Sequence, residues 1–209
     1  MTVLDKLSSR LGRHDEVPNQ ELATLIVTSK DGTAVKELVD NLSNKDKKVR
    51  SDCVKVLYEI GEKSPEMIAP YHEDFGKLLG SGDNRLVWGG VTALDSIALV
   101  NPEGVYLLLP EIMKAADGGS VIARDHAVGV LTKLATLEAY SESCVRHLLK
   151  LLRTCPDNQF PMYAEMSLKA VNKGNRTSLM KVFNERMKGL KKESQKKRVK
   201  AVLSKLGES

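Results

Sequence analysis

Apolar residues recur along this chain at an interval of 37 positions. A row of large residues follows this step: Leu57, Leu94, Leu131 and Leu168. A second apolar row keeps the same step: Ile60, Ile97, Leu134 and Val171. A row of small residues does so as well: Cys53, Gly90, Ala127 and Ala164. A fixed period of about 20 to 50 residues is typical of stacked repeats, so the pattern predicts a chain built from copies of one unit.

Residues 33–66 give the content of one unit. Apolar residues at helical spacing predict a first helix, on Ala34, Val35, Leu38 and Leu42. A second helix is predicted from Val49, Cys53, Val56, Leu57 and Ile60. Between the two, Asp46 is suited to accept backbone N–H bonds as an N-cap. Gly61 is predicted to end the second helix, so the unit is a helical hairpin.

The other copies reproduce these parts. The N-cap row is predicted at Asp46, Asp83, Ser120 and Asp157. Three residues later an apolar row follows, at Val49, Leu86, Ala123 and Phe160. The core row of the first helix is predicted at Leu38, Phe75, Ile112 and Leu149. The small row at Cys53 is expected where helices of neighbouring hairpins approach closely, because long side chains there would overpack.

The two ends are less regular, as capping repeats are expected to be. Residues 2–12 and 18–29 predict a divergent first hairpin, and residues 176–190 and 193–206 predict a last one. The sequence thus predicts an all-α, right-handed α-α superhelix of about six helical hairpins. We expect a single domain over 1–209, with a capping hairpin at 1–32, four regular repeats at 33–172 and a basic capping hairpin at 173–209.

The segment from Asp46 to Gly61 resembles the second helix of a HEAT repeat, with Asp followed by Val-Arg, small residues, Leu and a closing Ile-Gly. The resemblance covers about residues 33–172. Of the later copies only Arg124 matches Arg50, whereas Val87 and Pro161 depart from the pattern. Because HEAT proteins are mostly non-catalytic scaffolds, the resemblance implies a protein that binds another protein, and it identifies no partner.

Composition places the chain in a broad class. It contains three cysteines without paired spacing, which argues against a disulfide framework. No apolar run reaches the length of a membrane span, and charged residues occupy the place of a signal peptide's apolar stretch. These features predict a cytoplasmic protein. We expect no cofactor and no metal, because phosphate loops, catalytic triads and paired cysteines are missing from the sequence.

The second helices are expected to line the concave face of the stack. Carrying their outward positions through the 37-residue period places six candidate partner-binding residues there: Tyr58, Trp88, Asp95, Asp125, His126 and Tyr163. Trp88 is the one tryptophan of the chain, and an exposed Trp among polar residues is typical of a binding anchor. The alternative is that Trp88 packs between hairpins, where Gly89 and Gly90 leave room for it.

Two further functions remain open from the sequence. Asp95, Asp125 and His126 could serve acid–base chemistry or hold a metal, although solvated side chains explain them more simply. Some DNA alkylation-repair glycosylases resemble this architecture. In an enzyme of that kind the candidate residues here would be Trp88, Asp95 and Arg124, but aromatic side chains for stacking a base are scarce.

The C-terminal end is strongly basic. From residue 173 onward there are 12 Lys or Arg against 3 Asp or Glu, whereas the preceding residues are slightly acidic. The densest run comprises Lys191, Lys192, Lys196, Lys197, Arg198 and Lys200. The simpler interpretation is the solvated face of a helix. The functional alternative is contact with nucleic acid, an acidic protein or anionic lipid.

Overall fold

The computed structural model describes residues 2–118 and 120–207. Within these residues the secondary structure consists of twelve α-helices and five short 3₁₀ segments, without a strand, so the fold class is all-α as predicted. The chain divides into two compact units, Met1–Ala127 (unit 1) and Val128–Ser209 (unit 2). Helix α8, Val121–Leu134, crosses the boundary. In the described part of the chain, no helix is both long and apolar enough to cross a membrane.

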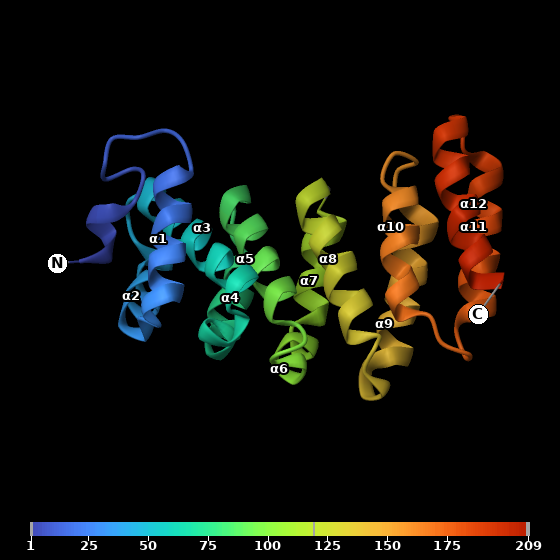
Figure 1. Cartoon of the computed structure of the whole chain (residues 1–209), viewed down its shortest axis with the longest axis horizontal. Helices are drawn as coiled ribbons and strands as arrows, with labels where there is room; N and C mark the ends of the chain where they lie inside the picture. The colour runs from blue at the N-terminus through green and yellow to red at the C-terminus, as the bar shows by residue number, and fades with distance from the viewer. Residues whose placement is uncertain (1, 119, 208–209) are drawn as a thin grey trace. The chain divides into compact units, whose positions relative to one another are not determined.

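Unit 1 contains seven complete helices, labelled in Figure 1. Their bounds are α1 Val17–Ser29, α2 Gly32–Asp40, α3 Lys47–Lys63, α4 His72–Leu78, α5 Asn84–Ile97, α6 Pro102–Leu107 and α7 Leu109–Asp117. The 3₁₀ segments are η1 Val3–Lys6, η2 Asn41–Ser43, η3 Pro65–Met67 and η4 Ala69–Tyr71. In the regular repeats of unit 1 the second helix of each hairpin is a single α-helix, whereas the first helix is divided into shorter segments: α2 with η2, then η3, η4 and α4, then α6 with α7.

Helix α3 is the centre of unit 1, because α1 packs on one side of it and α5 on the other. The predicted core rows lie inside this packing: Leu38, Leu57, Ile60, Phe75, Leu94, Ile97 and Ile112 have no exposed surface. The repeat period therefore identified the core of unit 1 correctly.

The predicted N-caps are confirmed in three repeats. Asp46 accepts a hydrogen bond from the backbone N–H of Lys48, and Asp83 accepts one from Arg85. The hydroxyl of Ser120 accepts from the N–H of Ala123 at 3.3 Å. Each bond satisfies a donor that the first turn of a helix leaves unpaired.

Two glycines of unit 1 show why short residues are needed between helices. Gly61 does not end α3, which continues to Lys63, so that prediction was wrong. Its role is close packing, because a Cβ at Gly61 would lie 2.3 Å from the hydroxyl oxygen of Ser96. A Cβ at Gly90 would lie 2.9 Å from the carbonyl oxygen of Phe75, which confirms the small row as a site of close approach.

The first hairpin differs from its prediction. Only η1 and turns occupy residues 2–12, and α1 already begins at Val17, inside the predicted connection. Leu7 is fully buried, whereas Leu11 is 54% exposed, because no helical face carries the second leucine into the core.

Unit 2 contains the end of α8 and four further helices: α9 Glu138–Thr154, α10 Phe160–Ser167, α11 Arg176–Gly189 and α12 Glu193–Gly207 (Figure 1), with η5 at Leu168–Ala170. Helix α9 packs against α11, and α10 packs against α12. Phe160 and Phe183 meet edge to face, with ring centroids 6.2 Å apart. The two helices predicted for the last hairpin are confirmed.

The fourth repeat departs from the predicted pattern. Asp157 does not cap a helix, since α10 begins only at Phe160, where Pro161 fits the first turn. Leu148 is buried in place of the predicted Leu149, which is half-buried. Leu168 and Val171 are also only partly buried, because α10 ends at Ser167 and cannot hold them on its core face.

Candidate functional site

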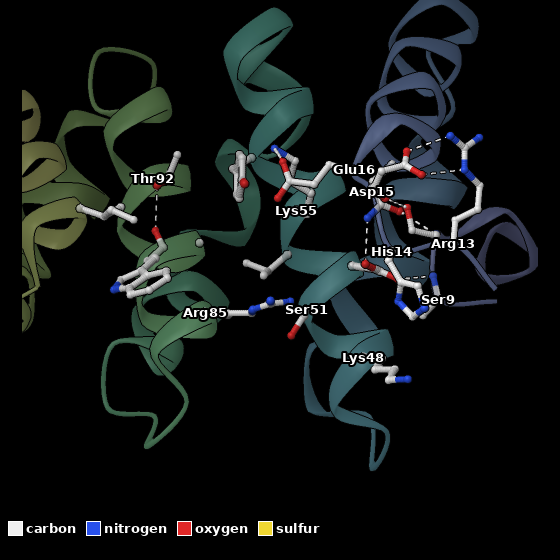
Figure 2. A pocket seen from close by; sticks show the side chains of 18 of the residues that line it. Ser9, Arg13, His14, Asp15, Glu16, Lys48, Ser51, Lys55, Arg85 and Thr92 are labelled. Atoms are coloured by element: carbon white, nitrogen blue, oxygen red, sulfur yellow. Dashed lines mark hydrogen bonds and ion pairs between the residues drawn. The ribbon is translucent and has the colours of Figure 1, made fainter. Parts of the chain in front are cut away.

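A cavity of about 670 Å³ lies within unit 1. Helices α3 and α5 form its floor, the first turns of α8 reach it, and residues 8–16 with the start of α1 close one end (Figure 2). We call this cavity the α3–α5 groove. Three predicted residues line it, namely Tyr58, Trp88 and His126. A cavity of this volume is in the range that binds small ligands or a short peptide segment.

The end wall is held by the carboxylate of Asp52 on α3. Its two oxygens accept hydrogen bonds from the backbone N–H of Ser9 and from the side-chain amide of Asn19, each at 2.8 Å. The side-chain oxygen of Asn19 in turn accepts from the N–H of Ser8 at 3.0 Å. The Asp52 carboxylate thereby holds residues 8–9 and the start of α1 against α3.

Lys55 forms the centre of an ion-pair network beside Tyr58. Its ammonium lies 2.7 Å from Glu59 and 2.8 Å from Glu16, and 4.7 Å from the centroid of the Tyr58 ring. Burial lowers the pKa of Lys55, but its hydrogen bonds to Glu16 and Glu59 outweigh burial, so the net pKa is raised. Burial also raises the pKa of Tyr58. Lys55 is therefore a fixed cation, already neutralised by its own carboxylates.

Trp88 lies in the groove and does not fill the space beside the neighbouring glycines. A Cβ at Gly89 would lie 2.4 Å from a methyl carbon of Val54. The space beside Gly89 is therefore occupied by Val54 of α3 and not by the indole. The carbonyl of Trp88 accepts from the hydroxyl of Thr92 at 2.8 Å (Figure 2). The indole nitrogen is buried and meets no hydrogen-bond acceptor in the described residues. The side chain is half-buried and lines the groove.

Asp95 and His126 form a pair across two helices. The Nδ1 atom of His126 lies 2.9 Å from a carboxylate oxygen of Asp95, which links α8 to α5. Asp125 is half-buried on α8 and does not line the groove. Among residues 2–118 and 120–207, no cluster of three or more His, Cys, Asp or Glu could hold a metal ion. The third residue of the enzymatic alternative, Arg124, donates to the carbonyl of Ala116 at 3.2 Å.

Tyr163 was predicted to offer contact area on the binding face, and its burial contradicts this. The side chain has no exposed surface and lies on α10 among buried residues that include Phe160 and Ala164. Tyr163 is therefore a packing residue.

Part of the basic end is engaged in ion pairs. The guanidinium of Arg198 makes two bonds to Glu165, at 2.6 and 2.7 Å, and these raise its pKa. Lys196 lies 2.7 Å from Glu193 on its own helix. The remaining predicted cations are exposed: Lys191, Lys192, Lys197 and Lys200. Nucleic-acid binding at this end stays a prediction.

Among the groove residues that sequence reasoning missed are Lys48, Arg85 and Ile122. They are separated by the same 37-residue step, so the period itself was the signal that could have found them. Lys48 and Arg85 occupy the first turns of α3 and α5, which contain no acidic residue there. A cation at that end of a helix opposes the macrodipole, at a cost of about 0.3–1 kcal/mol each.

No protein-family model matches this chain, and no curated protein matches it. Solved structures do. A designed armadillo repeat protein in complex with the peptide (KR)4 is 17% identical, with a TM-score of 0.68 over 88% of this chain and 85% of its own. Computationally designed armadillo repeat proteins for modular peptide recognition are 16% identical, with a TM-score of 0.67 over 97% of each chain.

A natural protein is also similar. The archaeal HEAT-like repeats protein from Thermococcus onnurineus NA1 is 12% identical, with a TM-score of 0.52 over 93% of this chain and 98% of its own. Together these similarities define the fold: the chain is an all-α helical repeat of the HEAT and armadillo type.

Proposed function

We propose that the α3–α5 groove binds an extended segment of a partner protein and that the chain is a non-catalytic interaction scaffold. The observation that carries the proposal is the groove itself, with a half-buried tryptophan and tyrosine on a rigid helical floor. Aromatic residues in a partly desolvated cleft are the side chains that dominate binding energy at protein interfaces. A similar designed repeat protein is solved with a peptide bound, which supports the class of ligand.

The groove is better suited to binding than to catalysis. Lys55 is neutralised by Glu16 and Glu59, and His126 is held by Asp95. Acid–base catalysis requires a titratable group that reaches the substrate with a pKa tuned to its task. Arg124, a candidate of the glycosylase alternative, is instead bonded to a backbone carbonyl outside the groove.

A selection from a random peptide library, followed by affinity measurements on the selected peptides, tests this proposal. Trp88→Ala is expected to weaken binding about 30-fold, the effect of losing a hot-spot residue worth about 2 kcal/mol. Leu107→Ala is the matched control, because Leu107 is 70% exposed and lies outside the groove. Peptides that bind Trp88→Ala as tightly as the wild type would place the binding surface elsewhere.

A further inference from the structure

Lys48 and Arg85 are the cations of the α3–α5 groove that the protein leaves without a carboxylate. Neither has an ion-pair partner in the described residues. Both are exposed, both line the groove and both occupy the same place in successive repeats. Figure 2 shows them on α3 and α5, with the Arg85 side chain extending from α5 toward Ser51 of α3. Two cations from adjacent helices thus share one end of the groove.

The other cations around the groove are already neutralised. Arg13 makes two bonds to Asp15 at 2.9 Å, and Lys55 is bonded to Glu16 and Glu59. Among the carboxylates, Asp52 is occupied by donors from the N-terminal segment. Arg13 and Lys55 are therefore ion-paired within the groove, whereas Lys48 and Arg85 are not, as far as the described residues go. Lys48 and Arg85 also lie in the first turns of α3 and α5, where a positive charge opposes the helix dipole. Residues that conflict with local stability without compensation are expected at functional sites.

Apolar surface lies beside these cations. Trp88 is one helical turn after Arg85 on α5. Ile122 also lines the groove and is 41% exposed. On α8 it is the equivalent, by the 37-residue period, of Lys48 on α3 and Arg85 on α5. A ligand at this end therefore meets two cations and an indole with an aliphatic neighbour.

The opposite end of the groove carries the opposite charge. Glu62 lines it near the end of α3, fourteen residues after Lys48, and has no ion-pair partner in the described residues. At 1.5 Å per residue the two charges are separated by roughly 21 Å along the helix. The groove is thus polarised and has no uniform charge.

We infer that the segment bound by this groove is acidic and apolar: its carboxylates face Lys48 and Arg85, and an apolar side chain covers Trp88 and Ile122. This inference rests on the proposed function and specifies its ligand. Its sign is opposite to that of the basic peptide (KR)4 bound by the similar designed protein. Complementary charge at the rim sets the choice of partner and the rate of association.

Three labelled octapeptides test the inference on the full chain by fluorescence polarisation: alternating Asp and Leu, alternating Ser and Leu, and alternating Lys and Leu. The acidic peptide is expected to bind at least tenfold more tightly than the neutral one at about 50 mM salt, and to lose most of this advantage at about 500 mM. The basic peptide is expected to bind most weakly.

The variant Lys48→Glu/Arg85→Glu should abolish the preference for the acidic peptide. Glutamate is favourable in the first turn of a helix, so this variant should fold at least as well as the wild type, which thermal unfolding verifies. Lys6→Glu/Lys114→Glu changes the net charge equally at exposed positions outside the groove and should keep the preference.

The possible failures are distinguishable. Equal binding of the acidic and neutral peptides, with both lost in Trp88→Ala, would overturn the inference and leave the proposed function intact. An acidic preference that survives Lys48→Glu/Arg85→Glu would also overturn it. Binding that is unchanged in Trp88→Ala, or no binding of any peptide, would contradict both the inference and the proposed function.

Discussion

The α3–α5 groove and the C-terminal hairpin both contain basic residues, but the two regions use them differently. In the hairpin, Arg198 and Lys196 are bonded to Glu165 and Glu193. In the groove, Lys48 and Arg85 line the same cavity as Trp88, and neither cation has an ion-pair partner in the described residues. The hairpin also contains four exposed cations without an ion-pair partner in the described residues, at Lys191, Lys192, Lys197 and Lys200. What distinguishes the groove is therefore that unpaired cations and a half-buried indole line one cavity.

A second contrast concerns the repeats themselves. In unit 1 the period is obeyed by caps, core and small residues, and the helices α3 and α5 of these repeats form the floor of the groove. In unit 2 the fourth repeat loses its cap, and its core residues are shifted or partly exposed. The regular repeats thus coincide with the candidate site. The following predictions measure this contrast, from the largest expected effect to the smallest.

Truncating equivalent leucines should affect the two units unequally. Leu94→Ala should lower the free energy of unfolding by about 3 kcal/mol, because Leu94 is fully buried and the truncation leaves a cavity. Leu168→Ala should cost only about 1 kcal/mol, since the side chain is partly exposed. Urea unfolding measures both. Equal losses would show that the fourth repeat packs as regularly as the second, against the present description.

Removing the cation of Lys55 should lower the free energy of unfolding more than removing that of Arg198, because the carboxylate of Glu59 is buried and that of Glu165 is partly exposed. Lys55→Met keeps the aliphatic stem but removes the nearest cation of Glu59, which is 8% exposed, and leaves it with Lys63 at 3.6 Å and a hydrogen bond to Gln20. We expect a loss of about 2 kcal/mol at neutral pH. Arg198→Met should cost at most about 0.5 kcal/mol, because its pair with Glu165 is about half exposed.

The pH dependence of the Lys55→Met effect gives its own check. Burial raises the pKa of Glu59, but Lys55, Lys63 and the hydrogen bond to Gln20 together outweigh burial, so the pKa lies below its ordinary value of 4.5. The ionised carboxylate therefore stabilises the fold above that value, and this stabilisation is lost as the pH falls through the lowered pKa. The difference between wild type and Lys55→Met should shrink on acidification below about pH 4.5. A constant difference would assign the effect to packing instead.

Replacing glycine by alanine should lower the stability at Gly89, where a neighbouring side chain is close, but not at Gly189, where no atom is near. Gly89→Ala places a Cβ 2.4 Å from Val54, and overpacking should exceed the gain in helix propensity, with a net loss of about 1 kcal/mol. Gly189→Ala meets no atom within 4 Å and should be neutral or slightly stabilising. Thermal unfolding of the two variants measures the contrast, and a stabilised Gly89→Ala would refute close packing of α3 on α5.

Much of the fold could be predicted from the sequence because helical repeats rely on local patterns. The rows at Leu57 and Leu94, the caps at Asp46 and Asp83 and the final hairpin all follow from spacing and side-chain chemistry. The failures have local causes. In the fourth repeat α10 ends at Ser167, so Leu168 and Val171 lie beyond the helix and are only partly buried. The N-terminal segment is held by side chains rather than by a helix, which no periodicity reveals.

The candidate site was predicted only in part. Tyr58, Trp88 and His126 line the groove, and their role in binding a partner stays a prediction. In the sequence Lys48 and Arg85 resemble ordinary surface residues. Only the fold shows that carboxylates near the groove pair with other cations and leave these two without an ion pair in the described residues. The handedness of the superhelix, the division into one domain with capping hairpins and the cytoplasmic location stay predictions.

Backbone hydrogen exchange with and without a saturating bound peptide tests the central claim most directly, because it maps the contact surface without altering the protein. The account predicts slower exchange in α3 and α5 and in residues 8–16, with no change in α11 and α12. Slower exchange confined to α11 and α12, with α3 and α5 unchanged, would contradict it.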